Sequence, residues 1–172
     1  MSNASLLLLS DLPVGAALAH LVEKEDREIP VQLAEGRQAL DQFFRSTSED
    51  QLATTRLVGF FTGTIVPRPY LEQLTLEPIN FHPAPPSLPG KEPVARAFED
   101  GVTHYGVTAH IMAEKVDTGP IITVSAFDVP SGLNEAALRY RTFLSGYKLF
   151  EFLLPYLIKA APIPTNPELQ WG

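Results

Sequence analysis

The chain has 172 residues, the length of one domain and enough to bury a core without disulfides or metal. It contains no cysteine, which excludes disulfides and thiolate nucleophiles, and its net charge of −7 argues against electrostatic binding of nucleic acid. Hydrophobic residues make up 45% of the chain, which argues against disorder, and no apolar run could span a membrane, so we expect a cytoplasmic protein without a membrane partner.

The first half of the chain alternates short apolar runs with segments of helical spacing. Residues 5–10 form an apolar run that Asp11 and Pro13 close, a pattern typical of a strand buried on both faces of a parallel sheet. Helical spacing follows at residues 14–24, with Ser10 or Asp11 as the cap. The pattern then predicts a strand at 29–34, a helix at 37–44 that could extend to 52, a strand at 56–61, a helical turn at 69–74 and a strand at 78–82.

The second half begins with a proline-dense loop and ends in a long helix. Its pattern predicts a loop at 83–93, a short helix at 94–100, strands at 106–113 and 121–126, and a helix from Asn134 to about Ala160. We expect Asn134 to cap the last helix and Pro155 to kink it. The organisation is therefore one domain at residues 1–161, followed by a proline-rich, extended tail at 162–172.

The end of the last helix carries apolar side chains on more than one face. We therefore expect either a homodimer or a tail that folds back over this helix, with Trp171 as the anchor of the tail. Strands that alternate with helices predict an α/β fold with a Rossmann-like, mostly parallel sheet. Ligands bind such sheets beyond the carboxyl ends of strands, which points to Ser10, Gly63, His82 and the segment after Ala113.

Asn80 and His82 close a predicted buried strand and precede a stiff loop with four prolines in the nine residues 82–90. Because they are two residues apart on a strand, their side chains point to the same face. An amide and an imidazole side by side can polarise a carbonyl group or stabilise an oxyanion. On spacing alone, the same pair satisfies backbone groups at a strand end equally well.

Asp117 lies in a loop between two predicted strands, where an aspartate before Thr-Gly-Pro is often only a turn device. With His82 nearby in space, it could instead orient the imidazole or act in proton transfer. His110 lies in the middle of a strand and is more typical of a structural histidine than of a ligand. The four histidines show no paired metal-ligand spacing, so we expect no metal site.

Three blocks of the sequence together resemble the folate-dependent formyltransferases, typified by glycinamide ribonucleotide formyltransferase and methionyl-tRNA formyltransferase. The blocks are residues 79–90, 106–110 and 116–122, and they occur in the order of the family and near its spacing. The resemblance is strongest over residues 57–123 and implies a formyltransferase fold with a Rossmann-like catalytic domain.

The resemblance also implies the catalytic set Asn80, His82 and Asp117 and the formyl donor 10-formyltetrahydrofolate. The residues that it places against the donor are Gly63, Thr64, Ile65 and Val66 in one loop, and Glu114 and Val116 in another. In the implied reaction an acceptor amine attacks the formyl carbon, while Asn80 and His82 stabilise the oxyanion. Asp117 holds His82 and helps to move a proton from the amine.

The sequence departs from this family in its N-terminal half. One predicted strand lies between Ser10 and Arg56 where the family has two, and Asp11 stands in place of a glycine-rich, phosphate-binding turn. We therefore do not expect glycinamide ribonucleotide as the acceptor, and the lack of a basic surface and a further C-terminal domain argues against transfer RNA. The loop after His82 resembles versions in enzymes that formylate small amines, such as amino-sugars or amino-acid-derived metabolites.

Three functions remain open on this basis. The first is an N-formyltransferase that acts on a small-molecule amine. The second is a formyltetrahydrofolate hydrolase on the same scaffold, which would turn over without any amine. The third is a catalytically degenerate formyltransferase-like binding protein, which weak or absent folate binding would favour.

Overall fold

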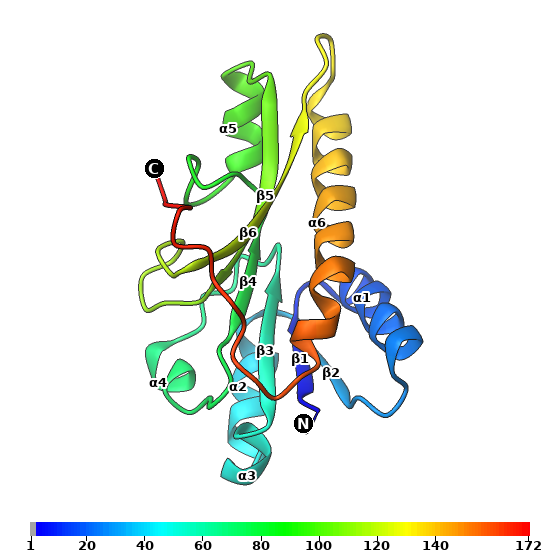
Figure 1. Ribbon diagram of the computed structural model, residues 1–172, viewed down its shortest axis with the longest axis vertical. Coiled ribbons are helices and arrows are strands. Elements are labelled where there is room, and N and C mark those ends of the chain that lie inside the picture. The colour runs from blue at the N-terminus through cyan, green and yellow to red at the C-terminus, as the bar shows by residue number, and fades with distance from the viewer. Residues whose placement is uncertain (1–2) are drawn as a thin grey trace.

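The computed structural model describes residues 3–172 and contains one six-stranded sheet in the order β2-β1-β3-β4-β5-β6 (Figure 1). The strands are β1 (Ser5–Leu9), β2 (Val31–Ala34), β3 (Thr55–Phe60), β4 (Ile79–His82), β5 (His104–Ile111) and β6 (Ile121–Asp128). The helices are α1 (Leu12–Glu25), α2 (Gly36–Ser46), α3 (Glu49–Leu52), α4 (Arg68–Leu71), α5 (Pro93–Glu99) and α6 (Glu135–Leu157). The predicted α/β fold is confirmed, and residues 1 and 2 of the predicted domain lie outside the described residues.

The sheet has a parallel part and an antiparallel part. Strands β2, β1, β3 and β4 pair in parallel, whereas β5 pairs antiparallel with both β4 and β6. The prediction of a mostly parallel sheet is confirmed, and so is the single strand between Ser10 and Arg56. The antiparallel pairing matters for the site because it sets residues of β5 directly opposite those of β4.

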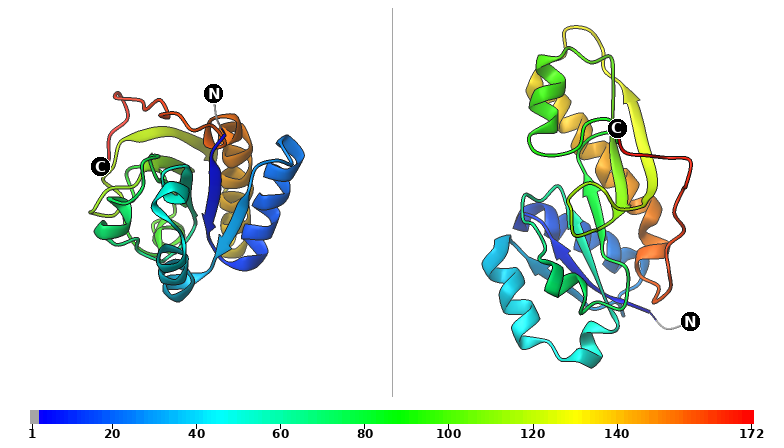
Figure 2. Two further views of the ribbon diagram at one scale, coloured as in Figure 1. Left: turned by 90° about the horizontal axis from the view of Figure 1, so that it is seen from below. Right: turned by 90° about the vertical axis from the view of Figure 1, so that its left-hand side faces the viewer.

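Helices cover both faces of the parallel strands. The side chains of β1 alternate, so that Leu6 and Leu8 pack with α1 and α6, while Leu7 and Leu9 pack with α2. Figure 2 shows α1 and α6 side by side on one face of the sheet and α2 on the other. Burial on both faces explains why β1, in the middle of the parallel part, is a continuous run of leucines.

Several predicted boundaries move in the structure. Residues 37–52 do not form one helix, because α2 ends at Ser46 and a capping box at Ser48 starts the separate helix α3. Strand β5 covers residues 104–111 rather than 106–113, and α6 ends at Leu157, two residues after Pro155. Asp11 and Asn134 both cap their helices as predicted, each by accepting a hydrogen bond from a backbone N–H three residues later.

The C-terminal tail is ordered: it buries Ile163 in the core cluster that contains the end of α6, and its later residues run along the sheet. Its backbone donates a hydrogen bond from Asn166 to the carbonyl of Ile121 in β6 (2.8 Å), and the Trp171 indole donates to the carbonyl of Gly119 (2.8 Å). The predicted anchor role of Trp171 is thereby confirmed. No helix within residues 3–172 is both long and apolar enough to cross a membrane.

Candidate active site

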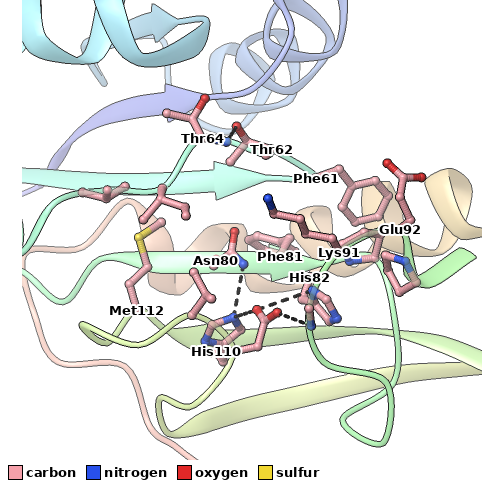
Figure 3. Close-up of a pocket in the computed structure, with 18 of the residues that line it drawn as sticks. Phe61, Thr62, Thr64, Asn80, Phe81, His82, Lys91, Glu92, His110 and Met112 are labelled. Atoms are coloured by element: carbon pink, nitrogen blue, oxygen red, sulfur yellow. Dashed lines mark hydrogen bonds and ion pairs between the residues drawn. The ribbon is translucent and has the colours of Figure 1, made fainter.

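A cavity of about 580 Å³ lies at the carboxyl ends of β3 and β4 (Figure 3). This volume is typical of a site for a small molecule. The sequence expectation holds for Gly63, His82 and the segment after Ala113, all of which belong to the cavity region, but not for Ser10, which does not line it. The residues that line the cavity include Phe61, Gly63, Thr64, Ile65, Val66, Asn80, His82, Lys91, Glu92, His110, Met112, Val116, Asp117 and Arg139.

The wall of this cavity contains strained backbone. Three non-glycine residues within the described chain have a positive φ, and all three line the cavity: Phe61 at 51°, Glu92 at 48° and Asp117 at 52°. This conformation costs about 1–2 kcal/mol for a residue with a Cβ and tends to occur at functional sites. The three strained residues therefore all lie at this cavity, where the positions of the side chains offset the cost of an unfavourable backbone conformation.

Asn80 lies at the centre of the cavity in β4, opposite Gly59 of β3. A Cβ at position 59 would come within 2.8 Å of the Asn80 Oδ1 atom, so glycine leaves the room that this side chain needs. The amide nitrogen of Asn80 lies 3.2 Å from Nε2 of His110. The side chain is therefore held in a defined orientation, with its N–H groups near the imidazoles.

His82 is 4% exposed and is held by its own proline loop. Its Nε2–H donates to the carbonyl of Leu88 (2.9 Å), because a carbonyl can only accept. The other ring nitrogen, Nδ1, lies 3.5 Å from Oδ1 of Asp117. Burial lowers the pKa of His82, although the Leu88 carbonyl and the Asp117 charge oppose that effect, so the imidazole is neutral near pH 7.

Asp117 lies in the loop between β5 and β6, where Gly119 allows a close backbone approach. A Cβ at position 119 would clash with the carbonyl of Ile111, so only glycine fits. The Asp117 Oδ2 atom accepts a hydrogen bond from the Gly90 backbone (2.8 Å). Burial alone would raise the pKa of Asp117, but His110 and the Gly90 N–H stabilise the carboxylate, and the net effect is a lowered pKa.

His110 is the member of this cluster that the sequence analysis missed. It lies in β5 directly opposite Asn80, and its Nε2 atom is 3.5 Å from Oδ1 of Asp117. Its Nδ1–H donates to the carbonyl of Ile111 (2.9 Å). Only an antiparallel pairing of residues 78–82 with 106–113 would have revealed this position, and the sequence pattern does not show strand direction.

The arrangement of the two imidazoles determines what the cluster can do with a proton. In the neutral rings, His82 Nδ1 and His110 Nε2 carry lone pairs, because their other nitrogens donate to carbonyls. Both lone pairs lie 3.5 Å from the same oxygen of Asp117. One added proton turns either contact into a charge-assisted pair, so the cluster can accept a proton from the cavity and release it again.

One side of the cavity is apolar. The predicted loop residues Gly63, Thr64, Ile65 and Val66 line it together with Val116, and Figure 3 shows Met112 on this side of Asn80. Ile65 and Val116 are each 53% exposed and both line the cavity, so together they offer apolar surface that suits contact with a flat apolar ring. Glu114 does not line the cavity, since it is exposed and forms an ion pair with Arg68 (3.4 Å).

The opposite side of the cavity carries charge. Lys91, Glu92 and Arg139 line it, and Figure 3 shows Lys91 and Glu92 beyond His82, on the side away from Met112. Arg139 forms ion pairs with Glu135 (2.6 Å) and Glu92 (3.6 Å). Nothing in the local spacing of these residues sets them apart from ordinary surface charges, so the sequence pattern alone does not predict their place in the cavity wall.

Within residues 3–172 no three His, Asp or Glu side chains are grouped so that they could hold a metal ion. The cluster itself consists of an amide donor, two imidazoles and a carboxylate beside a cavity with one apolar and one charged side. This set of groups can stabilise an oxyanion and move a proton.

Comparisons with known proteins agree with this description. Residues 15–150 match the family model described as formyl transferase. The chain is 32% identical over 145 residues to the human trifunctional purine biosynthetic protein adenosine-3, covering 78% of this chain and 14% of that protein. It is 33% identical over 109 residues to methionyl-tRNA formyltransferase of Geobacillus thermodenitrificans, covering 62% of this chain and 34% of that one.

A solved structure shows the same fold. The N-formyltransferase of Helicobacter canadensis, in complex with folinic acid and dTDP-3-aminofucose, superposes with a TM-score of 0.73 at 16% identity, covering 98% of this chain and 70% of that one. The chain thus spans about a seventh to a third of the two curated relatives and most of the structural neighbour.

Proposed function

Because the chain belongs to the formyl transferase family, we propose that it is an N-formyltransferase that moves the formyl group of 10-formyltetrahydrofolate to the amine of a small molecule. The observation that carries the proposal is that Asn80, His82 and Asp117 meet at one cavity in a chain of this family. The donor supplies an activated formyl group, and the protein supplies binding, orientation and proton transfer.

The apolar side of the cavity fits the ring system of the donor. Ile65, Val66 and Val116 offer apolar surface, and the loops that carry them offer backbone groups for hydrogen bonds. In the folded chain Ile65 and Val116 expose about half of their surface, so a bound ring would remove apolar area from water. Folinic acid, a folate, is bound to the H. canadensis enzyme, which supports a folate in this chain.

The charged side of the cavity suits the acceptor. Glu92 can attract the ammonium form of an amine, while Lys91 and Arg139 can bind an anionic group on the same molecule. The H. canadensis enzyme is in complex with dTDP-3-aminofucose, an amino-sugar attached to a nucleoside diphosphate, and this molecule carries both features. An amino-sugar nucleotide is therefore the first class of acceptor to test.

Catalysis in this proposal rests on the residues of the buried cluster. An N–H of Asn80 stabilises negative charge that develops on the formyl oxygen when the amine attacks, a contribution of about 3 kcal/mol for a well-placed donor. His82 adds to this once its Nδ1 has taken up a proton, because its Nε2–H already donates to the Leu88 carbonyl. The attacking amine loses a proton, and the His82–Asp117–His110 group can take it up and return it to the departing nitrogen. No covalent bond to the protein is required.

The test is to follow consumption of 10-formyltetrahydrofolate with and without a panel of amines, including amino-sugar nucleotides and amino acids. We expect consumption only when an amine is present, with a mass increase of one formyl group on that amine. Consumption without any amine would show the hydrolase instead. No consumption together with no folate binding would show the degenerate binding protein.

A further inference from the structure

The C-terminal tail contacts the reacting cluster although it lies outside the matched family region, residues 15–150. Trp171 packs edge-to-face against two imidazoles, with ring centres 4.9 Å from His110 and 5.9 Å from His82. Both histidines line the cavity and Trp171 does not. The indole therefore supports the imidazoles from behind and leaves the space for ligands free.

The tail also joins the two loops that carry the cluster. The indole N–H of Trp171 donates to Gly119, two residues after Asp117, while the backbone N–H of Gly172 donates to Pro86 (3.1 Å) in the loop after His82. Two neighbouring tail residues are thus hydrogen-bonded to both loops at once. Figure 1 shows the end of the tail beside these loops, at a distance in space from the end of α6, where the tail begins.

We propose that Trp171 is a positioning residue for the reaction proposed above. It keeps the imidazoles of His82 and His110 and the loop of Asp117 in fixed positions relative to one another. The spacing of the cluster explains why such support is needed. Asp117 lies 3.5 Å from each imidazole, a distance at which no short hydrogen bond fixes the rings against each other. One nitrogen of each imidazole is fixed by its hydrogen bond to a backbone carbonyl. The indole of Trp171 restricts the remaining rotation of both rings.

The first part of the test uses Trp171 as its own probe, because it is the only tryptophan in the chain. In a ¹H–¹⁵N spectrum of the whole protein, we expect one indole N–H that exchanges with solvent at least about tenfold more slowly than a free indole, since it is hydrogen-bonded. An indole that exchanges at the free rate would overturn the proposal.

The second part follows the imidazoles directly. Long-range ¹H–¹⁵N spectra should show His82 protonated at Nε2 and His110 at Nδ1, and W171A should broaden or shift both patterns. The variant Q170A changes the exposed neighbour and should leave them as they are. Unchanged imidazole spectra in folded W171A would overturn the proposal whether or not the protein transfers formyl groups.

The third part measures turnover per folate-binding site. We expect W171A to lower kcat about tenfold with little change in the donor KM, and W171F, which keeps a ring but loses the N–H donor, to recover part of that loss. Equal kcat in wild type and W171A would contradict a positioning role. If the wild type itself shows no turnover, the proposed function fails, and the imidazole spectra alone decide the role of Trp171.

Discussion

Two buried polar clusters lie at opposite ends of the same sheet and differ in how tightly they are bonded. At the amino end of β3, Arg56 is fully buried and donates to four backbone carbonyls at 2.6–3.1 Å, those of Glu77, Leu157, Lys159 and Ala161. At the carboxyl end of β4, the two imidazoles lie 3.5 Å from Asp117 and face a cavity.

The difference separates a cluster that stabilises the fold from one that can do chemistry. Three of the four contacts of Arg56 tie the end of α6 and the start of the tail to the sheet, and the fourth ties the segment before β4. Arg56 does not line the cavity. In the other cluster, one Asp117 oxygen lies 3.5 Å from a ring nitrogen of each imidazole, so the carboxylate can stabilise a proton taken up by either ring without a short hydrogen bond that would hold the proton there. Changes in the two clusters should therefore have opposite consequences.

The largest expected effect is the loss of activity in Asp117→Asn. Asparagine tolerates the left-handed backbone and can still accept from Gly90, so the fold should keep its melting temperature. It cannot pair with a protonated imidazole, and we expect kcat to fall by about 10²–10⁴-fold. The control is Asp128→Asn, which changes an exposed aspartate beside His104. Equal activity in Asp117→Asn and wild type would remove the carboxylate from the mechanism.

The opposite change is Arg56→Met, which should cost stability rather than catalysis. Four backbone carbonyls lose the donor of a fully buried guanidinium, and we expect the free energy of unfolding to fall by about 3–5 kcal/mol in a denaturant titration, with kcat per folded molecule unchanged. Arg37→Met is the matched control, because Arg37 is exposed and its ion pair with Asp41 should contribute little to stability. If Arg56→Met lowered kcat under conditions in which the variant is fully folded, Arg56 would not have a purely stabilising role.

The smallest effect is a dependence of stability on pH that comes from His82. Its pKa in the folded protein lies below the usual 6.5, so the unfolded chain binds a proton first as the pH falls below about 6.5. Stability should then decline with falling pH, by at most about 1.4 kcal/mol per pH unit for one group, until the folded protein also takes up the proton. His82→Gln should reduce this slope in urea titrations at pH 7, 6 and 5. A slope that is unchanged in the variant would assign the effect to other groups.

The sequence predicted one part of the site better than the other for a physical reason. The period of two along a strand places Asn80 and His82 on one face, and both indeed line the cavity. His110 could not be added in the same way, because its position depends on antiparallel pairing with β4. Asp117 was brought into the set by resemblance, since 35 residues separate it from His82 and local spacing does not connect them.

The same reasoning explains why the Arg56 cluster was not predicted. Arg56 opens an apolar run and looks like an ordinary residue at the start of a strand. Its partners lie up to 105 residues away and are backbone carbonyls, which carry no sequence signal. Regular elements and their caps follow from local patterns, whereas buried polar clusters depend on contacts between distant segments.

The most direct measurement is a calorimetric titration of the protein with 5-formyltetrahydrofolate, repeated on Ile65→Asp and on Leu12→Asp. Ile65 lines the apolar side of the cavity, while Leu12 is similarly exposed (49%) but lies on α1, outside the cavity. We predict micromolar binding to the wild type and to Leu12→Asp, and affinity at least about tenfold weaker for Ile65→Asp, which puts a charge against the ring. Absence of binding to the wild type at millimolar ligand, or equal binding to both variants, would contradict the folate site.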